Sequence, residues 1–214
     1  METYELLTKL SEAAGPAGYE QSIRQLVKHL WEPLADDLRV DAMGNLIALQ
    51  RGKQKPDAPR RTVMAAAHMD EIGLIVTGIE REFLRVHSLG GIDRRVLLGL
   101  QVCVHGDTPL AGVIASRPPH VLPKADRQKV LPWHELFIDI GLTPDEVKEK
   151  VHVGDYVTID QPLSRLSNER SSGKAMDNRA SLAALTLTLK ALQRRRHAWD
   201  FYAVATVQEE VGIK

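Results

Sequence analysis

The sequence predicts an α/β domain that is interrupted once by an inserted β domain. Helical periodicity alternates with apolar, strand-like runs over residues 1–73, and the same alternation returns over residues 165–214. Between them, over residues 74–164, short β-prone runs are separated by glycine and proline. Alternating helices and strands pack as layers of one α/β domain, whereas a series of short strands is typical of a sandwich or barrel. We therefore expect a discontinuous α/β domain, 1–73 with 165–214, around a barrel-like insertion, 74–164.

Two helices and a hairpin are expected first. Helices are predicted over residues 2–10 and 20–31. The pattern is strongest in the second segment, where apolar side chains recur every three or four positions, at Ile23, Leu26, Val27, Leu30 and Trp31. The segment between these helices is rich in glycine and proline and predicts a turn. Residues 38–49 predict a hairpin in which Gly44-Asn45 supplies the positive φ angles.

The remaining elements follow from the same two periodicities. An apolar run from Thr62 predicts a buried strand that ends at His68. In the insertion, five short runs predict strands, at 83–86, 102–104, 112–115, 137–140 and 156–159. Leucines on one helical stripe predict a long helix after residue 173, and residues 201–207 predict a further strand.

Composition excludes several partners. The chain has 28 basic residues (Lys and Arg) and 28 acidic residues (Asp and Glu), so its formal net charge is zero. This charge does not favour binding to nucleic acid or to an anionic membrane. No segment reaches the roughly 18 apolar residues of a membrane span, and the acidic N-terminus is unlike a signal peptide. Cys103 is the single cysteine, so no disulfide forms within the chain. We expect a cytoplasmic protein without nucleic-acid or membrane partners.

Three apolar segments end in polar clusters, at residues 68–71, 174–179 and 208–210. His68 and Asp70 project to the same side of an extended chain, because side chains alternate along a strand. Ligands of open α/β sheets gather beyond the carboxyl ends of the strands, so the three clusters are expected to meet there. One imidazole with several carboxylates is a donor set for zinc, cobalt or manganese.

The residues alone leave a plainer explanation open for each cluster. His68 and Asp70 fit an ordinary polar turn, Asp177 fits an N-cap or near-cap position of a helix, and Glu209-Glu210 fits a solvated turn. In the functional alternative, one of two adjacent glutamates binds a metal while the other faces the water that the metal activates. The two oxygens of Asp177 would then bridge two ions.

Five ordered motifs carry a resemblance to a known family. They are Ser11-Glu12-Ala13-Ala14-Gly15-Pro16-Ala17-Gly18-Tyr19-Glu20, Asp41-Ala42-Met43-Gly44-Asn45-Leu46, Ala67-His68-Met69-Asp70-Glu71-Ile72-Gly73, Gly173-Lys174-Ala175-Met176-Asp177-Asn178-Arg179 and Gln208-Glu209-Glu210-Val211-Gly212. The whole chain resembles the glutamyl and tetrahedral aminopeptidases, family forty-two of the metallopeptidases, some members of which have been labelled endoglucanases. The resemblance implies a mixed-sheet peptidase domain of the zinc-peptidase type, phosphorylase/hydrolase-like, and a β-barrel-like insertion that serves dimerisation.

The resemblance also implies roles for five residues. His68 would bind one of two divalent ions, Asp177 would bridge both, and Glu210 would bind the other. Glu209 would be the general base, and Asp70 would hold the ring of His68. The substrate would be a peptide, and self-association through the insertion would give assemblies from dimers up to dodecamers.

The sequence departs from the resembled family at its end. It stops at Lys214, four residues after Glu210, whereas the family continues and supplies a further Asp and a further His ligand. Each ion would then be one ligand short, and the strand that ends at Val207 would have an unpaired apolar edge. We expect a C-terminally truncated form of a metal-dependent aminopeptidase that acts on the N-termini of short peptides.

Two alternatives are kept. The shortage of ligands leaves open whether the chain is active, and in the first alternative it is catalytically incompetent and acts only as an assembly or binding module. A glycoside hydrolase is the weaker alternative, because Glu209 and Glu210 are adjacent in sequence and are not the usual pair that faces across a glycosidic bond.

Overall fold

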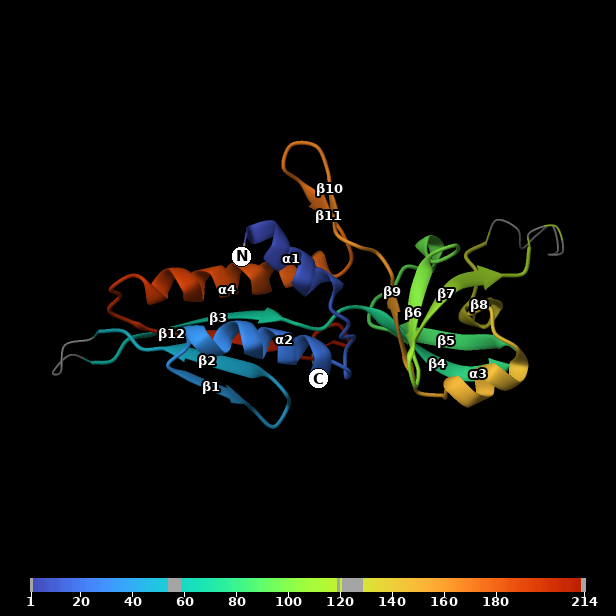
Figure 1. Cartoon of the computed structure of the whole chain (residues 1–214), viewed down its shortest axis with the longest axis horizontal. Helices are drawn as coiled ribbons and strands as arrows, with labels where there is room; N and C mark the ends of the chain where they lie inside the picture. The colour runs from blue at the N-terminus through green and yellow to red at the C-terminus, as the bar shows by residue number, and fades with distance from the viewer. Residues whose placement is uncertain (1, 54–58, 119, 121–128, 213–214) are drawn as a thin grey trace. The chain divides into compact units, whose positions relative to one another are not determined.

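The chain folds into two compact units (Figure 1). The computed structural model describes residues 2–53, 59–118, 120 and 129–212. The first unit, here the sheet unit, comprises Met1–Glu71 and Pro162–Lys214, and the second, here the barrel unit, comprises Ile72–Gln161.

A four-stranded mixed sheet forms the centre of the sheet unit. Its strands lie in the order β1 (Asp37–Val40), β2 (Leu46–Gln50), β12 (Asp200–Thr206) and β3 (Thr62–His68). The β1–β2 and β2–β12 pairs are antiparallel, whereas β12 and β3 are parallel and bring Thr206 opposite His68. Two short strands, β10 (Ser164–Arg165) and β11 (Ser171–Ser172), pair separately.

Three helices complete the core of the sheet unit. They are α1 (Thr3–Glu12), α2 (Gln21–Trp31), which is followed by the 3₁₀ turn η1 (Glu32–Leu34), and α4 (Met176–Gln193). Their apolar stripes pack with side chains from one face of the sheet, among them Leu46, Ala48, Ala203 and Ala205. Trp31 is fully buried, and its Nε1–H donates to Thr186 Oγ1 at 2.8 Å. This hydrogen bond joins α2 to α4 within the core.

Two expectations about the sheet are wrong. The strand that ends near Val207 has no free edge, because β12 pairs with β2 on one side and β3 on the other. Within the described residues the two edge strands are β1 and β3. Strand β3 is therefore not buried throughout, and 71% of Met64 is exposed. Strand order depends on contacts that are remote in sequence, so apolar composition alone does not locate an edge.

The hairpin turn differs in one detail from the expected turn. Gly44 has a φ of +101°, whereas Asn45 is not among the residues with positive φ. Asn45 donates instead from its backbone N–H and its side-chain Nδ2 to the two carboxylate oxygens of Asp41, at 2.9 and 2.8 Å. The side chain of Asp41 therefore stabilises the turn in place of a second left-handed residue.

Six antiparallel strands close the barrel of the other unit. They are β4 (Gly73–Glu80), β5 (Phe83–Leu89), β6 (Gln101–His105), β7 (Pro109–Ser116), β8 (Leu136–Asp139) and β9 (Tyr156–Ile159), in the spatial order β4-β5-β8-β7-β6-β9. The 3₁₀ turns η2 (Arg94–Val96) and η4 (Trp133–Glu135) and the helix α3 (Pro144–Lys150) lie in the connections. With the mixed sheet, this barrel confirms the predicted fold class.

The barrel unit has its own hydrophobic core. Alternate residues of each strand point inward, for example Val102 and Val104 of β6, as expected for a two-residue side-chain period. Val147 of α3 is fully buried and packs into the same cluster. None of the helices in the described part of the chain is long and apolar enough to cross a membrane.

The hydrogen bond between Trp31 and Thr186 can be tested by substitution. Thr186→Val keeps the shape of the side chain but leaves the buried indole N–H without its acceptor, so the free energy of unfolding should fall by about 1–3 kcal/mol. Thr186→Ser keeps the hydroxyl group and should lose less. Urea unfolding followed by circular dichroism measures both variants, and equal losses would contradict the role of the hydroxyl.

Candidate metal centre

The candidate residues meet where two parallel strands end. Because Thr206 lies opposite His68, the segments that follow β12 and β3 leave the sheet at the same end, where both strands terminate. The first residue after β3 keeps them together, since Met69 N donates to Thr206 O at 2.7 Å. The carboxyl ends of neighbouring parallel strands are the usual position of a ligand site in such sheets.

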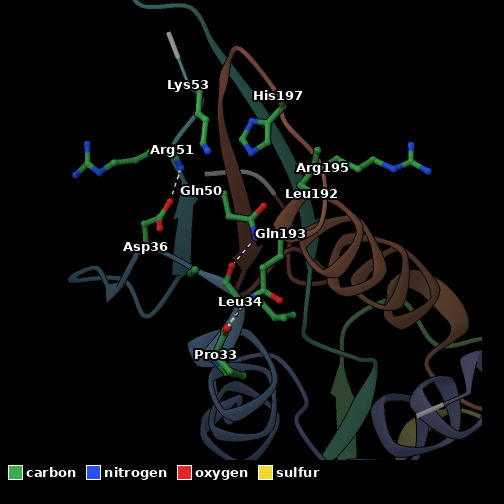
Figure 2. A pocket seen from close by; sticks show the side chains of 11 residues that line it. Pro33, Leu34, Asp36, Gln50, Arg51, Lys53, Leu192, Gln193, Arg195 and His197 are labelled. Atoms are coloured by element: carbon green, nitrogen blue, oxygen red, sulfur yellow. Dashed lines mark hydrogen bonds between the residues drawn. The ribbon is translucent and has the colours of Figure 1, made fainter.

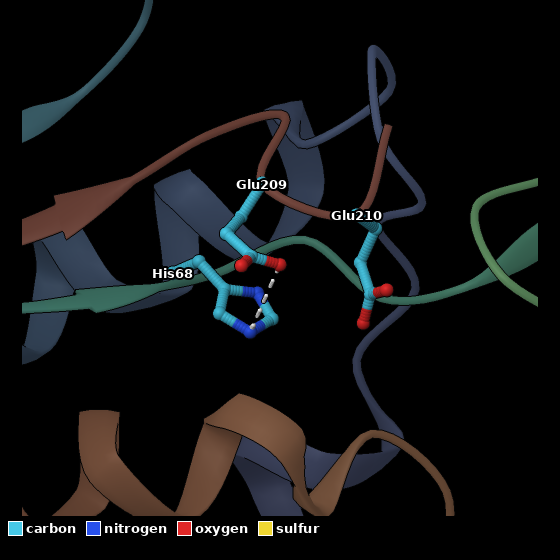
Figure 3. Close-up of side chains that lie close together, drawn as sticks. All are labelled: His68, Glu209 and Glu210. Carbon is cyan, nitrogen blue, oxygen red and sulfur yellow. Dashed lines mark ion pairs between the residues drawn. The ribbon is translucent and has the colours of Figure 1, made fainter. Parts of the chain in front are cut away.

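An imidazole and two carboxylates form a compact cluster beyond the carboxyl ends of these strands (Figure 3). One possible ligand atom each of His68, Glu209 and Glu210 lies within 4.8 Å of the others. His68 Nε2 is 3.9 Å from Glu209 Oε2. His68 is buried, whereas Glu209 is exposed and Glu210 is half-buried. The cluster therefore has a fixed imidazole at its base and carboxylates that face outward.

Asp177 approaches His68 from the start of α4. Its Oδ1 is 3.0 Å from His68 Nε2, although 87% of the Asp177 side chain is exposed. Asp177 is not part of the three-residue cluster. The N-cap of α4 is Ala175, with a φ of +53°, and the Asp177–Asn178 peptide bond is cis. Asp177 is therefore not the N-cap itself but lies in the first turn of the helix, and its carboxylate contacts the imidazole.

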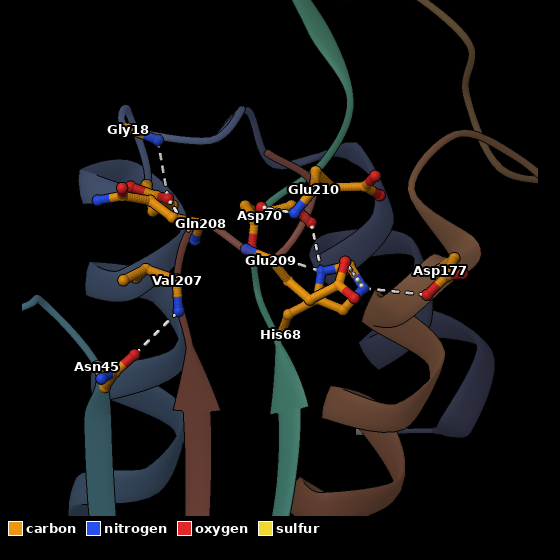
Figure 4. A network of polar contacts seen from close by, with 10 residues as sticks. Gly18, Asn45, His68, Asp70, Asp177, Val207, Gln208, Glu209 and Glu210 are labelled. Carbon is orange, nitrogen blue, oxygen red and sulfur yellow. Dashed lines mark hydrogen bonds and ion pairs between the residues drawn. The ribbon is translucent and has the colours of Figure 1, made fainter. Parts of the chain in front are cut away.

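Asp70 connects the imidazole to both glutamates (Figure 4). His68 Nδ1 lies 3.0 Å from the backbone oxygen of Asp70 and 3.5 Å from its Oδ1. The two carboxylate oxygens of Asp70 accept the backbone N–H groups of Glu209 and Glu210 at 3.1 and 2.9 Å. Asp70 is fully buried, so it orients the ring and the glutamates from behind.

The carboxylates around His68 favour the positively charged form of its imidazole. Hydrogen bonding to Asp70 is the largest effect and raises the pKa of His68 to about 9 against the lowering effect of burial, with a further contribution from Asp177. Burial raises the pKa of Asp70, but His68 and the two backbone amides outweigh burial and leave that pKa below its usual value. Burial raises the pKa of Glu210.

The donor geometry fits a divalent metal ion. Two ligands of one tetrahedral zinc ion, each about 2.0–2.1 Å from it, lie about 3.3 Å apart. The separations of His68 Nε2 from Asp177 Oδ1 and from Glu209 Oε2, 3.0 and 3.9 Å, lie on either side of that value. One imidazole with carboxylates is a donor set that zinc, cobalt and manganese accept.

A buried ion pair supports the cluster and was not predicted from the sequence. Lys174 Nζ donates to both carboxylate oxygens of Glu71, at 2.9 and 2.8 Å, and Gly15 N donates to one of them at 3.0 Å. Glu71 follows Asp70, and Lys174 lies three residues before Asp177, so the pair joins the two segments that carry candidate ligands. Both residues belong to family-like motifs, but no sequence spacing links positions that far apart.

Arg179 packs behind the same segments. It is fully buried, and its Nη1 donates to the carbonyl oxygens of Leu10 and Ala13 at 2.6 and 3.0 Å. Burial lowers the pKa of Arg179 to about 10. The side chain thus caps the end of α1 where the chain turns toward Gly15.

A separate pocket of the sheet unit lies between η1, β2 and the end of α4 (Figure 2). Gln50 crosses it, and its Nε2 donates to the carbonyl oxygens of Leu34 and Leu189. The lining contains several cationic side chains and one carboxylate, that of Asp36. None of the five candidate residues lines this pocket, so it does not share the chemistry of the cluster.

Comparison with known proteins identifies a family. The profile of the M42 glutamyl aminopeptidases matches residues 44–214. A lysyl aminopeptidase of Pyrococcus furiosus is 34% identical over 220 residues, an alignment that covers 100% of this chain and 61% of that protein.

Solved structures give the same result. A TET aminopeptidase from a marine-sediment Thaumarchaeota archaeon superposes with a TM-score of 0.89 at 39% identity, covering 98% of this chain and 60% of that one. The TET1 peptidase of Pyrococcus horikoshii, described as assembling into a tetrahedron or a large octahedral shell, has a TM-score of 0.86 at 36% identity over 99% of this chain and 62% of its own.

The chain spans about three fifths of the length of these relatives. Its match to the family profile extends over most of its own length and includes the residues from Gly44 through both strand ends. The chain therefore belongs to the M42 glutamyl aminopeptidase family.

Proposed function

We propose that this chain is part of a metal-dependent aminopeptidase that releases the N-terminal residue of short peptides through water activated by two metal ions. The observation that supports the proposal is the convergence of His68, Glu209 and Glu210 beyond the ends of two parallel strands, where Asp177 contacts His68 from the start of α4. The names of the relatives, which are aminopeptidases, support the same reaction class.

Three residues would hold the ions. His68 and Glu210 would each bind one divalent ion, and Asp177 would contribute its two oxygens to both. Zinc, cobalt and manganese all suit this donor set. When bound, such ions polarise the scissile carbonyl group and lower the pKa of water, which makes hydrolysis possible near neutral pH.

The remaining two residues would manage the proton and the geometry. Glu209 is exposed and lies beside His68, so its Oε2 can take the proton that water loses as its oxygen attacks the carbonyl carbon. Glu209 would return this proton to the leaving amine nitrogen as the C–N bond breaks, which balances the reaction. Asp70 would keep the imidazole and the backbone of Glu209 in place.

The barrel unit is proposed to serve self-association, from dimers up to dodecamers. One solved relative is described as a dodecamer and another as a tetrahedral or octahedral shell. The described part of the barrel unit also exposes large apolar side chains, at Val96, Leu98, Val113, Val130 and Val153. A cytoplasmic location is proposed because Cys103 is the single cysteine of the sequence.

Metal binding is the first test. Titration calorimetry with zinc, cobalt and manganese should show binding to the wild-type chain, and His68→Ala should weaken it more than about 100-fold, because a direct ligand matters more than the supporting residues that cost 10–100-fold. His134→Ala removes an exposed imidazole of the barrel unit and is the matched control. A wild-type chain without affinity for these ions would refute the metal site.

The proposed base is tested by Glu209→Gln. This variant keeps the size of the side chain but cannot accept the proton, so hydrolysis of aminoacyl p-nitroanilides should fall by about 10²–10⁴-fold. Its metal content, measured by elemental analysis, should stay close to that of the wild type. Unchanged hydrolysis would refute the role of Glu209, and metal binding without any hydrolysis by the wild type would favour a binding or assembly module.

Self-association is tested by light scattering. The wild-type chain should show a mass above that of one chain, and Val96→Ser with Leu98→Ser should shift the mass downward because exposed apolar area is lost from the barrel unit. Val40→Ser changes an exposed apolar residue of the sheet unit and is the control. A wild type that remains at the mass of one chain at all concentrations would contradict the proposal.

A further inference from the structure

The segment that carries both glutamates is held by side chains instead of by strand pairing. Strand β12 ends at Thr206, and residues 207–210, here the glutamate segment, leave the sheet. Each of the four backbone N–H groups in this segment donates to a side-chain oxygen (Figure 4). Asp70 accepts the last two, as described above, and two further residues accept the first two.

Glu20 accepts the second N–H group. Its Oε1 lies 3.0 Å from Gln208 N and 2.9 Å from Gly18 N, and the residue is 5% exposed. Gln208 has a φ of +59°, a left-handed conformation that is unfavourable for a residue with a side chain. The carboxylate of Glu20 stabilises that conformation by accepting the backbone N–H of Gln208 itself, because hydrogen bonds to charged groups are stronger than neutral ones.

Asn45 accepts the first N–H group. Its Oδ1 is 3.0 Å from Val207 N. The orientation of this amide is determined by its other end, since Nδ2 donates to Asp41 Oδ2 at 2.8 Å. Asp41 is in turn oriented by the backbone N–H groups of Met43 and Gly44, each 3.0 Å from its Oδ1. Asn45 therefore presents a rigid acceptor from the turn between β1 and β2.

We propose that Glu20 and Asn45 are positioning residues for the two glutamates of the candidate metal centre. Asp70 holds only the second half of the glutamate segment, and the left-handed residue Gln208 lies directly before it. Without Glu20 and Asn45, rotation about Gln208 would move the backbone from which Glu209 and Glu210 project. This inference deepens the proposed function and rests on it where metal binding is concerned.

The physical consequence is a local one. Loss of one hydrogen bond to a charged group raises the equilibrium constant for local opening of the backbone by about tenfold or more. The amide hydrogen of Gln208 should then exchange with solvent faster by the same factor. Residues that hold metal ligands from behind affect metal affinity by about 10–100-fold. Both effects should occur while the helices and strands of the sheet unit stay folded.

The experiment compares four variants of the full chain with the wild type. Glu20→Ala and Asn45→Ala remove the acceptors, whereas Glu20→Gln keeps a side-chain oxygen for Gln208 N. Glu146→Ala removes a carboxylate that accepts a backbone N–H in the barrel unit, that of Thr143 at 2.9 Å, and is the matched control. Amide hydrogen exchange of the glutamate segment, exchange of β2 and α4, and zinc affinity are measured for each.

In Glu20→Ala we expect exchange at least about tenfold faster in the glutamate segment, and in Asn45→Ala, which removes a neutral acceptor, about 2–10-fold faster. In both variants β2 and α4 should stay protected as in the wild type. Zinc affinity should fall by about 10–100-fold. Glu20→Gln should recover most of both losses, and Glu146→Ala should leave both unchanged.

Two results would overturn the proposal. If exchange rises equally throughout the sheet unit, Glu20 and Asn45 have a general role in stability. If exchange and zinc affinity match the wild type, they have no role at the cluster. A wild-type chain that binds none of zinc, cobalt and manganese refutes the proposed function instead, and the exchange measurement still decides whether these residues position the glutamates.

Discussion

The candidate site depends on the parallel pairing of β3 with β12. This register places Thr206 opposite His68, so two segments that are remote in sequence leave the sheet side by side. A shift by one residue would turn every side chain of one strand to the other face and would separate His68 from Glu209. The core under the sheet enforces the register, because Ala67, Ala203 and Ala205 are buried against the helices only in this alignment.

Beyond the strand ends, buried polar side chains replace the hydrogen bonds of the sheet. Asp70 accepts two consecutive backbone N–H groups and contacts the imidazole, and Glu71 binds Lys174 shortly before Asp177. A loop that carries functional groups is normally mobile, since its backbone groups lack regular partners. Here the partners come from rigid elements, and this is the condition under which a metal or catalytic site keeps its geometry.

The candidate residues lie in only one of the two units. All five candidate residues belong to the sheet unit, whereas the barrel unit has a hydrophobic core of its own and contributes none of them. A closed barrel also leaves no free strand edge, so its outer surface can interact with other molecules without disturbing its hydrogen bonding. This arrangement is compatible with an insertion whose surface serves self-association while the sheet unit holds the chemistry.

Sequence periodicity by itself determined the helices α2 and α4, the short strands of the insertion and the mixture of α and β structure, because these patterns reflect local burial. His68, Asp177 and Glu209-Glu210 could also be singled out as candidates from the sequence, since imidazole and carboxylate groups next to apolar segments are poor core material. Only the tertiary structure decided that β3 lies at an edge of the sheet, that Asp177 contacts His68, and that Glu71 pairs with Lys174. These contacts join residues far apart in the chain, and their partners are chosen by strand register and packing, which no local pattern encodes.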